Sequence, residues 1–159
     1  MARSSPVLTA GSLQSRSSSA SRTATPREHE RGSWLLTRAS NGERQDIEGS
    51  CHCKKVRFRA SLAIEDGTSD CNCSICSRVG WIMKSIPPSQ FELVAGETEQ
   101  TDYQFGGKSM HHRFCSTYGI HAFGSFTHEV ATKIVVNVRC LDGVDLAKLE
   151  VETFNRKSS

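Results

Sequence analysis

Five of the seven cysteines lie at the short spacings that are typical of zinc ligands. Cys71, Cys73 and Cys76 fall within a span of six residues, in a largely polar stretch. Zinc prefers thiolates in a tetrahedral shell, and short loops let several sulfurs converge on one ion at small entropic cost. The spacing therefore predicts that these three cysteines bind one metal ion. A closed structural site normally has four protein ligands, so three leave a position for water or substrate, and an open position implies chemistry.

Cys51 and Cys53 form a second group, which Cys115 joins from further along the chain. By CxxC spacing the fourth ligand would be residue 118, but this residue is Tyr118. A phenol with an ordinary pKa near 10 is a much poorer zinc ligand than a thiolate. We therefore expect a structural zinc site short of one sulfur. It is completed by water, His52, Tyr118 or another nearby side chain, or it binds metal weakly. The alternative is that these cysteines are packed thiols.

The remaining cysteine, Cys140, has no cysteine neighbour and follows an alternating stretch, so we expect a buried apolar side chain outside both sites. The odd number of cysteines argues against a disulfide framework, and no secretory n-region or continuous h-region is recognisable. Cysteines at these spacings are better explained as metal ligands in a reducing compartment. We therefore expect an intracellular protein, most simply a cytoplasmic one.

Residues 1–45 differ in composition from the rest of the chain. They are rich in Ser, Arg, Thr, Ala and Gly, with few apolar residues and no sustained period, which predicts a disordered tail. The first 27 residues contain four Arg and no Asp or Glu, a composition also found in organelle transit peptides. Mitochondrial import is therefore an alternative to a plain solvated tail.

The formal net charge of +3 is concentrated in the N-terminal part of the chain. Residues 1–31 hold five Arg against two Glu, and fifteen basic and fifteen acidic residues follow. A neutral body argues against broad binding to phosphate backbones, which requires clustered Lys and Arg. No stretch approaches the roughly 20 apolar residues that span a bilayer, so we expect no membrane segment.

The elements that must position the cysteines are β-strands of one domain, expected over residues 46–155. Residues 55–60 alternate strictly, which places Val56, Phe58 and Ala60 on one face of a strand. Further strands are expected at residues 91–95, 101–105, 111–115, 121–126 and 133–139.

Sharp breaks separate several of these strands. Pro87 and Pro88 cannot continue a ladder, and residues 106–108 are typical of a hairpin turn. Residues 144–149 could form one helical turn or two. The pattern favours an antiparallel, mainly β protein.

Two pairs of side chains near the cysteines have more than one interpretation. His111 and His112 lie on a predicted strand before Cys115, so they face opposite sides and at most one could approach a metal. Ordinary polar or packing roles are the preferred interpretation for both. Trp81 and Met83 could line a substrate pocket, although core packing is the more common role of an aromatic in such a position.

Three cysteine motifs follow one another in a specific order. They are Gly49-Ser50-Cys51-His52-Cys53, Cys71-Asn72-Cys73-Ser74-Ile75-Cys76 and Phe114-Cys115-Ser116-Thr117-Tyr118-Gly119. Together with Val56, Phe58 and residues 103–106, this order resembles the glutathione-dependent formaldehyde-activating enzyme family, which also includes centromere protein V. The resemblance covers about residues 47–154.

This resemblance implies a mainly β, Mss4-like zinc-binding domain with antiparallel sheets and up to two zinc ions. The structural zinc would be held by Cys51, Cys53 and Cys115. The catalytic zinc would be held by Cys71, Cys73 and Cys76. Tyr118 stands where the family has its fourth structural cysteine. The implied activity is condensation of glutathione with formaldehyde to S-hydroxymethylglutathione, classed as a carbon-sulfur lyase reaction from the reverse direction.

Our leading hypothesis is therefore a zinc-dependent, carbon-sulfur lyase-like enzyme whose partner is a small thiol such as glutathione. The open site of Cys71, Cys73 and Cys76 motivates it. A second hypothesis is a non-catalytic, zinc-stabilised interaction module of the centromere protein V type, which the Arg-rich tail directs to nucleic acid or the cytoskeleton. A third is a relative in which Tyr118 has cost the fold its structural metal.

Overall fold

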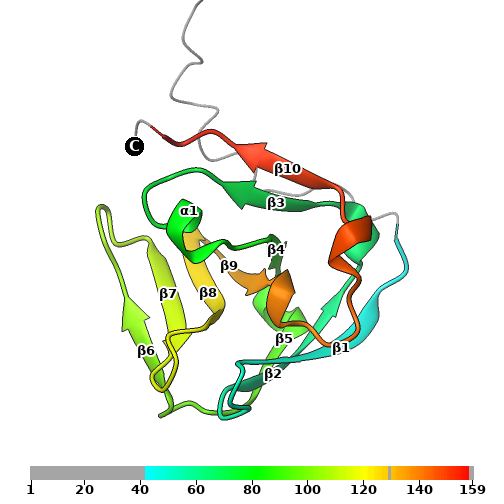
Figure 1. Cartoon of the computed structure of the whole chain (residues 1–159), viewed down its shortest axis with the longest axis horizontal. Coiled ribbons are helices and arrows are strands. Elements are labelled where there is room, and N and C mark those ends of the chain that lie inside the picture. Colours follow the sequence, from blue (N-terminus) through cyan, green and yellow to red (C-terminus); the bar gives the residue numbers. More distant parts are fainter. Residues whose placement is uncertain (1–41, 129, 158–159) are drawn as a thin grey trace, which may run out of the picture.

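The computed structural model describes residues 42–128 and 130–157, so the predicted tail over residues 1–45 lies almost entirely outside the described part. Within the described part, ten strands form two sheets, with one short α-helix, α1 (Cys76–Val79), and several 3-10 turns (Figure 1). The prediction of a mainly β fold is confirmed.

The smaller sheet has the strand order β1-β2-β5 and is antiparallel throughout. Its strands are β1 (Gln45–Ser50), β2 (Arg57–Leu62) and β5 (Phe91–Ala95). The alternation that predicted a strand near β2 has the expected effect, because Val56, Phe58 and Ala60 are all buried. The face that they share packs against the larger sheet.

The larger sheet has seven strands in the order β10-β3-β4-β9-β8-β7-β6. In chain order the strands are β3 (Thr68–Cys71), β4 (Met83–Ile86), β6 (Gln100–Tyr103), β7 (Met110–Cys115), β8 (His121–His128), β9 (Ala131–Asn137) and β10 (Val151–Phe154). All its strand pairs are antiparallel except β10 with β3, which pair in parallel at one edge.

The predicted strands match the observed ones where the sequence alternates or carries a turn signal. β5 has the predicted bounds, and β6 to β9 differ from them by a few residues. The hairpin turn between β6 and β7 is confirmed, with the Lys108 N–H donating to the Phe105 carbonyl oxygen at 3.0 Å. Of the helical turns expected at 144–149, the structure has one 3-10 turn, Leu146–Lys148. Four strands, β1, β3, β4 and β10, were not predicted.

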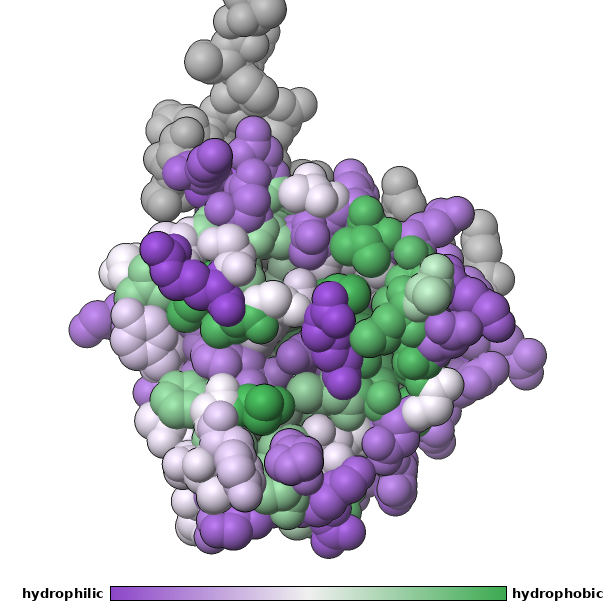
Figure 2. Space-filling model, in the orientation of Figure 1, coloured by the Kyte–Doolittle hydropathy of each residue, from purple (hydrophilic) through white to green (hydrophobic). Residues whose placement is uncertain are grey.

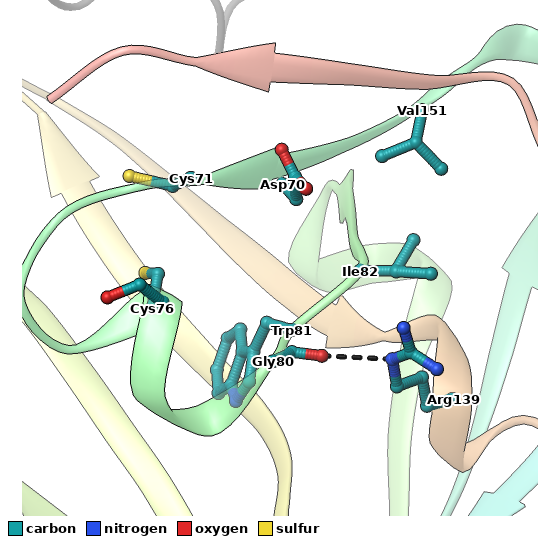
Figure 3. Close-up of a pocket in the computed structure, with 9 residues that line it drawn as sticks. Asp70, Cys71, Cys76, Gly80, Trp81, Ile82, Arg139 and Val151 are labelled. Atoms are coloured by element: carbon teal, nitrogen blue, oxygen red, sulfur yellow. Dashed lines mark hydrogen bonds between the residues drawn. The ribbon is translucent and has the colours of Figure 1, made fainter.

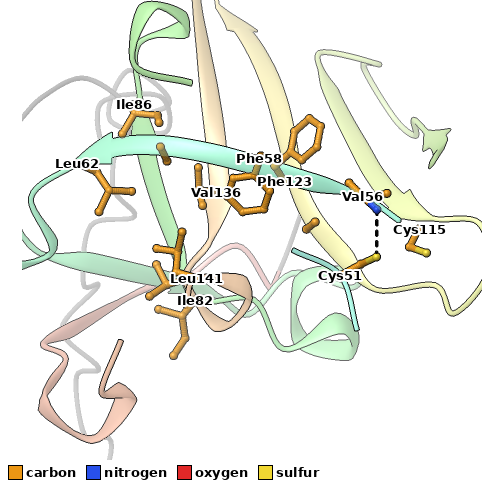
Figure 4. Close-up of a cluster of buried hydrophobic side chains, with 13 residues drawn as sticks. Cys51, Val56, Phe58, Leu62, Ile82, Ile86, Cys115, Phe123, Val136 and Leu141 are labelled. Atoms are coloured by element: carbon orange, nitrogen blue, oxygen red, sulfur yellow. Dashed lines mark hydrogen bonds between the residues drawn. The ribbon is translucent and has the colours of Figure 1, made fainter. Parts of the chain in front are cut away.

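The two faces of the larger sheet carry two different hydrophobic clusters. The main core lies between the sheets and includes Phe58, Leu62, Phe123 and Val136 (Figure 4). On β9, Val135 faces the other way, because successive side chains of a strand point to opposite faces. The second cluster contains Cys71, Trp81, Met83 and Val135, against which Cys73 and Cys76 pack. This outer face of the larger sheet therefore carries the loop rich in cysteine.

Candidate metal centres

The junction cluster, which is Cys51, Cys53 and Cys115, lies where the two sheets meet. Cys51 and Cys53 belong to the turn between β1 and β2, and Cys115 is the last residue of β7. The Sγ atom of Cys53 lies 3.5 Å from that of Cys51 and 3.5 Å from that of Cys115. Two sulfurs on one tetrahedral zinc, with bonds of about 2.3 Å, are separated by about 3.8 Å. The three thiols are therefore spaced to share one ion.

Tight turns shape the junction cluster. Lys54 adopts a positive φ of 61°, and its N–H donates to the Cys51 carbonyl oxygen at 3.0 Å. This turn brings the Val56 N–H to 3.4 Å from the Cys51 sulfur, to which it donates. In the second turn the Gly119 N–H donates to the Cys115 carbonyl oxygen at 2.7 Å. Such turns aim backbone donors at sulfurs, which favours the thiolate that a metal requires.

Hydrogen bonding in the junction cluster favours ionisation of Cys115. Burial would raise the pKa of this thiol, but the N–H groups of Tyr118 and Thr117 and the neighbouring thiols outweigh burial and lower the pKa to about 7. Burial raises the pKa of Cys51. One member of the cluster is thus prepared to ionise near neutral pH before any metal arrives.

Tyr118 supplies no sulfur at the position where a fourth ligand was expected. Its side chain is 59% exposed, and its ring lies edge-on to His52 with the ring centroids 5.5 Å apart. Among the described residues, the metal-ligating side chains that converge at the junction are the three cysteines. The junction cluster therefore offers three sulfurs, as the sequence indicated.

The loop cluster, which is Cys71, Cys73 and Cys76, lies on the outer face of the larger sheet. Cys71 ends β3 and Cys76 begins α1, so a short loop carries all three. Their sulfurs lie within 4.8 Å of one another. The Cys73 N–H donates to the Cys71 sulfur and the Cys76 N–H to the Cys73 sulfur, both at 3.5 Å. The predicted trio is thus brought together in space.

Burial and hydrogen bonding divide the thiols of the loop cluster. Burial raises the pKa of Cys76 and of Cys71. Burial also opposes ionisation of Cys73, but the N–H groups of Cys76 and Ile75 and the two neighbouring thiols lower its pKa overall. Cys73 is therefore the member of the loop cluster that ionises first.

A pocket of about 350 Å³ opens beside the loop cluster (Figure 3). Its lining consists of Asp70, Cys71, Cys76, Ser77, Gly80, Trp81, Ile82, Arg139 and Val151. Trp81 has the expected core-packing role, because it is 2% exposed in the second hydrophobic cluster, and it also lines this pocket. Asp70 and Arg139 were not predicted as site residues, because they are far apart in the sequence and no motif connects them.

The other candidate side chains lie outside both clusters. His111 and His112 face opposite sides of β7, as predicted. His111 contacts Asp102, with 2.6 Å between Nδ1 and Oδ2, and His112 is buried with its ring centroid 5.8 Å from that of Trp81. Cys140 belongs to neither cluster and packs against the core between the sheets, where burial raises its pKa to about 11.

Comparison with known proteins identifies the family. A model of the glutathione-dependent formaldehyde-activating enzyme family matches residues 46–157, a stretch that contains both clusters. The chain belongs to this family. Glutathione-dependent formaldehyde-activating enzymes are Mss4-like, so the prediction of this fold is confirmed.

A solved relative supports the fold of this formaldehyde-activating enzyme family member. The crystal structure of a protein from Rhodobacter sphaeroides is 33% identical in sequence and superposes with a TM-score of 0.61. The alignment covers 67% of this chain and 99% of the bacterial one. No helix in the described part of the chain is long and apolar enough to cross a membrane.

Proposed function

We propose that this protein is a zinc-dependent, carbon-sulfur lyase-like enzyme that condenses glutathione with formaldehyde to S-hydroxymethylglutathione, or acts on a related small thiol adduct. The observation that carries the proposal is that three thiols converge at the edge of a pocket. Among the described residues, no fourth metal-ligating side chain joins them. Membership of the family supports the choice of glutathione and formaldehyde.

The loop cluster fits a zinc ion. Its sulfurs lie close enough to share one tetrahedral ion, and backbone N–H groups donate hydrogen bonds to the sulfurs of Cys71 and Cys73. Zinc bound there would supply a Lewis acid, which favours a substrate thiolate over the thiol or polarises a carbonyl group.

The residues around the loop cluster confine the reactants. In the condensation the thiol sulfur bonds to the carbonyl carbon, and the thiol proton ends on the new hydroxyl oxygen, so no oxidant is needed. The buried ring of Trp81 and the side chain of Ile82 give the pocket an apolar wall close to Cys71 and Cys76. An apolar wall excludes water and strengthens the electrostatic interactions of a charged sulfur.

The junction cluster is proposed to hold a second, structural zinc through Cys51, Cys53 and Cys115. Its sulfur separations fit one ion, and its position between the sheets suits a structural role. All the cysteines are free thiols. Free thiols in this number support a reducing compartment such as the cytoplasm.

Metal analysis of the purified protein tests the assignment of the loop cluster. We expect Cys73→Ser to lose about one equivalent of zinc relative to the unmodified protein. Cys140→Ser is the matched control, because Cys140 lies outside both clusters and should leave the zinc content unchanged. Less than about half an equivalent in the unmodified protein, or an unchanged content in Cys73→Ser, would contradict the assignment.

Exchange spectroscopy tests the reaction itself. Two-dimensional exchange NMR on glutathione and formaldehyde should show faster interconversion with S-hydroxymethylglutathione when the zinc-loaded protein is added. The acceleration should be lost in Cys73→Ser and kept in Cys140→Ser. If the unmodified protein does not exceed the uncatalysed rate, this substrate pair is rejected.

A further inference from the structure

Asn72, which lies between two cysteines of the loop cluster, is bonded to the C-terminal end of the domain. Its backbone N–H donates to the Phe154 carbonyl oxygen at 3.2 Å. Its side-chain Nδ2 donates to Asn155 Oδ1 at 2.9 Å, and its Oδ1 accepts from the Arg156 N–H at 2.7 Å. One residue of the loop therefore bonds to three consecutive residues, which are the last of β10 and the two that follow it.

These bonds continue the pairing of β3 with β10 into the loop. The parallel register places Phe154 opposite Cys71, which is the last residue of β3 and the first ligand of the loop cluster. Figure 1 shows the two strands side by side, with the chain passing from β3 through the loop to α1. The next residue after Asn72 is Cys73, whose N–H donates to the Cys71 sulfur at 3.5 Å. The bonds of Asn72 thus hold the backbone between the first two ligands.

The C-terminal strand buries little apolar surface of its own. Three of the four residues of β10 are exposed, and Phe154 is half-buried against the second hydrophobic cluster. Figure 2 shows hydrophilic residues at the upper edge of this face, where β10 ends. An edge strand with few buried apolar contacts opens easily unless hydrogen bonds hold it. The bonds of Asn72 are therefore important for keeping the end of β10 against the loop.

A side-chain amide suits this position, because it offers an oxygen acceptor and N–H donors in one plane. Both kinds of group are used at once, since Arg156 donates to the oxygen and Asn155 accepts from the nitrogen. Two bonds in different directions fix the amide and, with it, the loop backbone. Residues that orient metal ligands without touching the ion usually change metal affinity ten- to hundred-fold when they are replaced.

We infer that Asn72 is a positioning residue, which attaches the metal-binding loop to the C-terminal strand and so holds the sulfurs of the loop cluster at the spacing of one ion. The inference rests on the proposed function, because it takes the loop cluster as the site of the ion. Metal affinity at the loop then depends on a strand that contributes no ligand. The hydrogen bonds of Asn72 do not reach the junction cluster, so metal affinity there should not depend on them.

Cobalt titration of the metal-free full chain tests this inference, followed by the absorption of cobalt bound to thiolates. The part of the signal that is absent from Cys73→Ser reports the loop cluster, and the remainder reports the junction cluster in the same sample. Asn72→Ala should weaken cobalt binding at the loop cluster about ten- to hundred-fold and leave the junction cluster unchanged. Asn155→Ala, which removes one of the two side-chain bonds from outside the loop, should weaken it several-fold.

The matched control is Ser74→Ala, because it removes a polar side chain from the same loop and leaves the side-chain bonds of Asn72 in place. Its cobalt affinity should match that of the unmodified protein at both clusters. Unchanged affinity at the loop cluster in Asn72→Ala overturns the inference. An equal loss at both clusters also overturns it, because this result would indicate a general loss of stability, and so does an equal loss in Ser74→Ala.

Hydrogen exchange of the metal-free protein separates this inference from the proposed function. Mass spectrometry should show faster exchange over residues 71–79 in Asn72→Ala than in the unmodified protein, with no change in the turn that carries Cys51 and Cys53. If the unmodified protein takes up no metal at the loop cluster, the proposed function fails, and hydrogen exchange decides whether Asn72 holds the loop. If the unmodified protein binds zinc there and accelerates the reaction, but Asn72→Ala changes neither exchange nor affinity, the inference about Asn72 fails alone.

Discussion

At the scale of single residues, the two clusters share one turn geometry. The Cys73 sulfur accepts from the N–H groups two and three residues later, those of Ile75 and Cys76. The Cys115 sulfur accepts from Thr117 and Tyr118, at the same two offsets. Tyr118 thus occupies the backbone position that Cys76 has in the loop cluster. The turn keeps its shape because backbone N–H groups, not the fourth thiol, stabilise it.

Substitution of Tyr118 by Cys should therefore complete the junction cluster. We expect the zinc-loaded Tyr118→Cys variant to melt about 5 °C or more above the unmodified protein, the shift for roughly 1 kcal/mol or more in a domain of this size. Differential scanning calorimetry with and without zinc measures the effect, which should vanish in the metal-free protein.

The control for this substitution is Tyr118→Phe. Its melting temperature should match that of the unmodified protein, because the exposed phenol contributes no ligand. A lower melting temperature for zinc-loaded Tyr118→Phe would show instead that the phenol oxygen binds the metal.

The ionisation order within the loop cluster predicts an order of chemical modification. The pKa of Cys73 is lowered from its ordinary value of 9.0, whereas burial raises those of Cys71 and Cys76. As pH rises, the Cys73 thiolate forms first, and thiolates are the species that react with iodoacetamide.

Peptide mass spectrometry of the metal-free protein, alkylated over a pH series, measures this order. Within the loop cluster, Cys73 should be modified before Cys71 and Cys76, with a midpoint below pH 9.0, the ordinary cysteine value. Modification of Cys76 before Cys73 would contradict the hydrogen-bonding pattern of the loop.

At the scale of elements, the ring of Trp81 packs against β8. Gly124 is the residue that allows this contact: a Cβ atom there would lie 2.5 Å from the His111 carbonyl oxygen, 2.8 Å from Met110 Cε and 3.3 Å from the Trp81 ring. A backbone oxygen cannot rotate away as a side chain can. The close approach of β7, β8 and Trp81 therefore depends on a glycine at this position.

Gly124→Ala should consequently destabilise the fold by about 1–3 kcal/mol, the usual cost of overpacking a filled site. Urea unfolding measures the change in the free energy of unfolding. The matched control is Gly107→Ala in the β6–β7 turn, where an added Cβ meets nothing within 4 Å. An equal, small effect of both substitutions would show that β7 and β8 can separate freely.

At the scale of the whole molecule, the two clusters constrain the chain differently. In the junction cluster, Cys53 and Cys115 are separated by 62 residues and connect the smaller sheet to the larger one. The loop cluster connects residues that are already neighbours in sequence. Cross-linking distant positions removes more conformational entropy from the unfolded chain than cross-linking close ones.

Loss of one junction ligand should therefore cost more stability than loss of one loop ligand. For the zinc-loaded protein we expect Cys115→Ser to lower the free energy of unfolding by about 2–4 kcal/mol, and Cys73→Ser by clearly less. Denaturant unfolding with and without a chelator measures both, and the difference should shrink when zinc is removed. A greater loss in Cys73→Ser would mean that the loop cluster holds the fold together.

The sequence by itself determined the features that depend on short-range spacing. Close cysteines predicted the loop cluster, alternation predicted the buried face of β2, and residues 106–108 predicted the β6–β7 hairpin. The grouping of Cys115 with Cys51 and Cys53, and the missing sulfur at Tyr118, followed from the order of the motifs. These features depend on neighbours within a few residues or on a known pattern, so they can be read along the chain.

Only the tertiary structure decided which distant residues share a site. Three of the strands, β3, β4 and β10, are short, and β3 pairs with β10 in parallel. No local alternation or hairpin turn in the sequence therefore predicted them. The pocket brings Asp70 and Arg139 together across separate elements, with Trp81 acting as both core and wall. Such encounters are set by the packing of two sheets around one core, and packing is a property of the whole fold rather than of any segment.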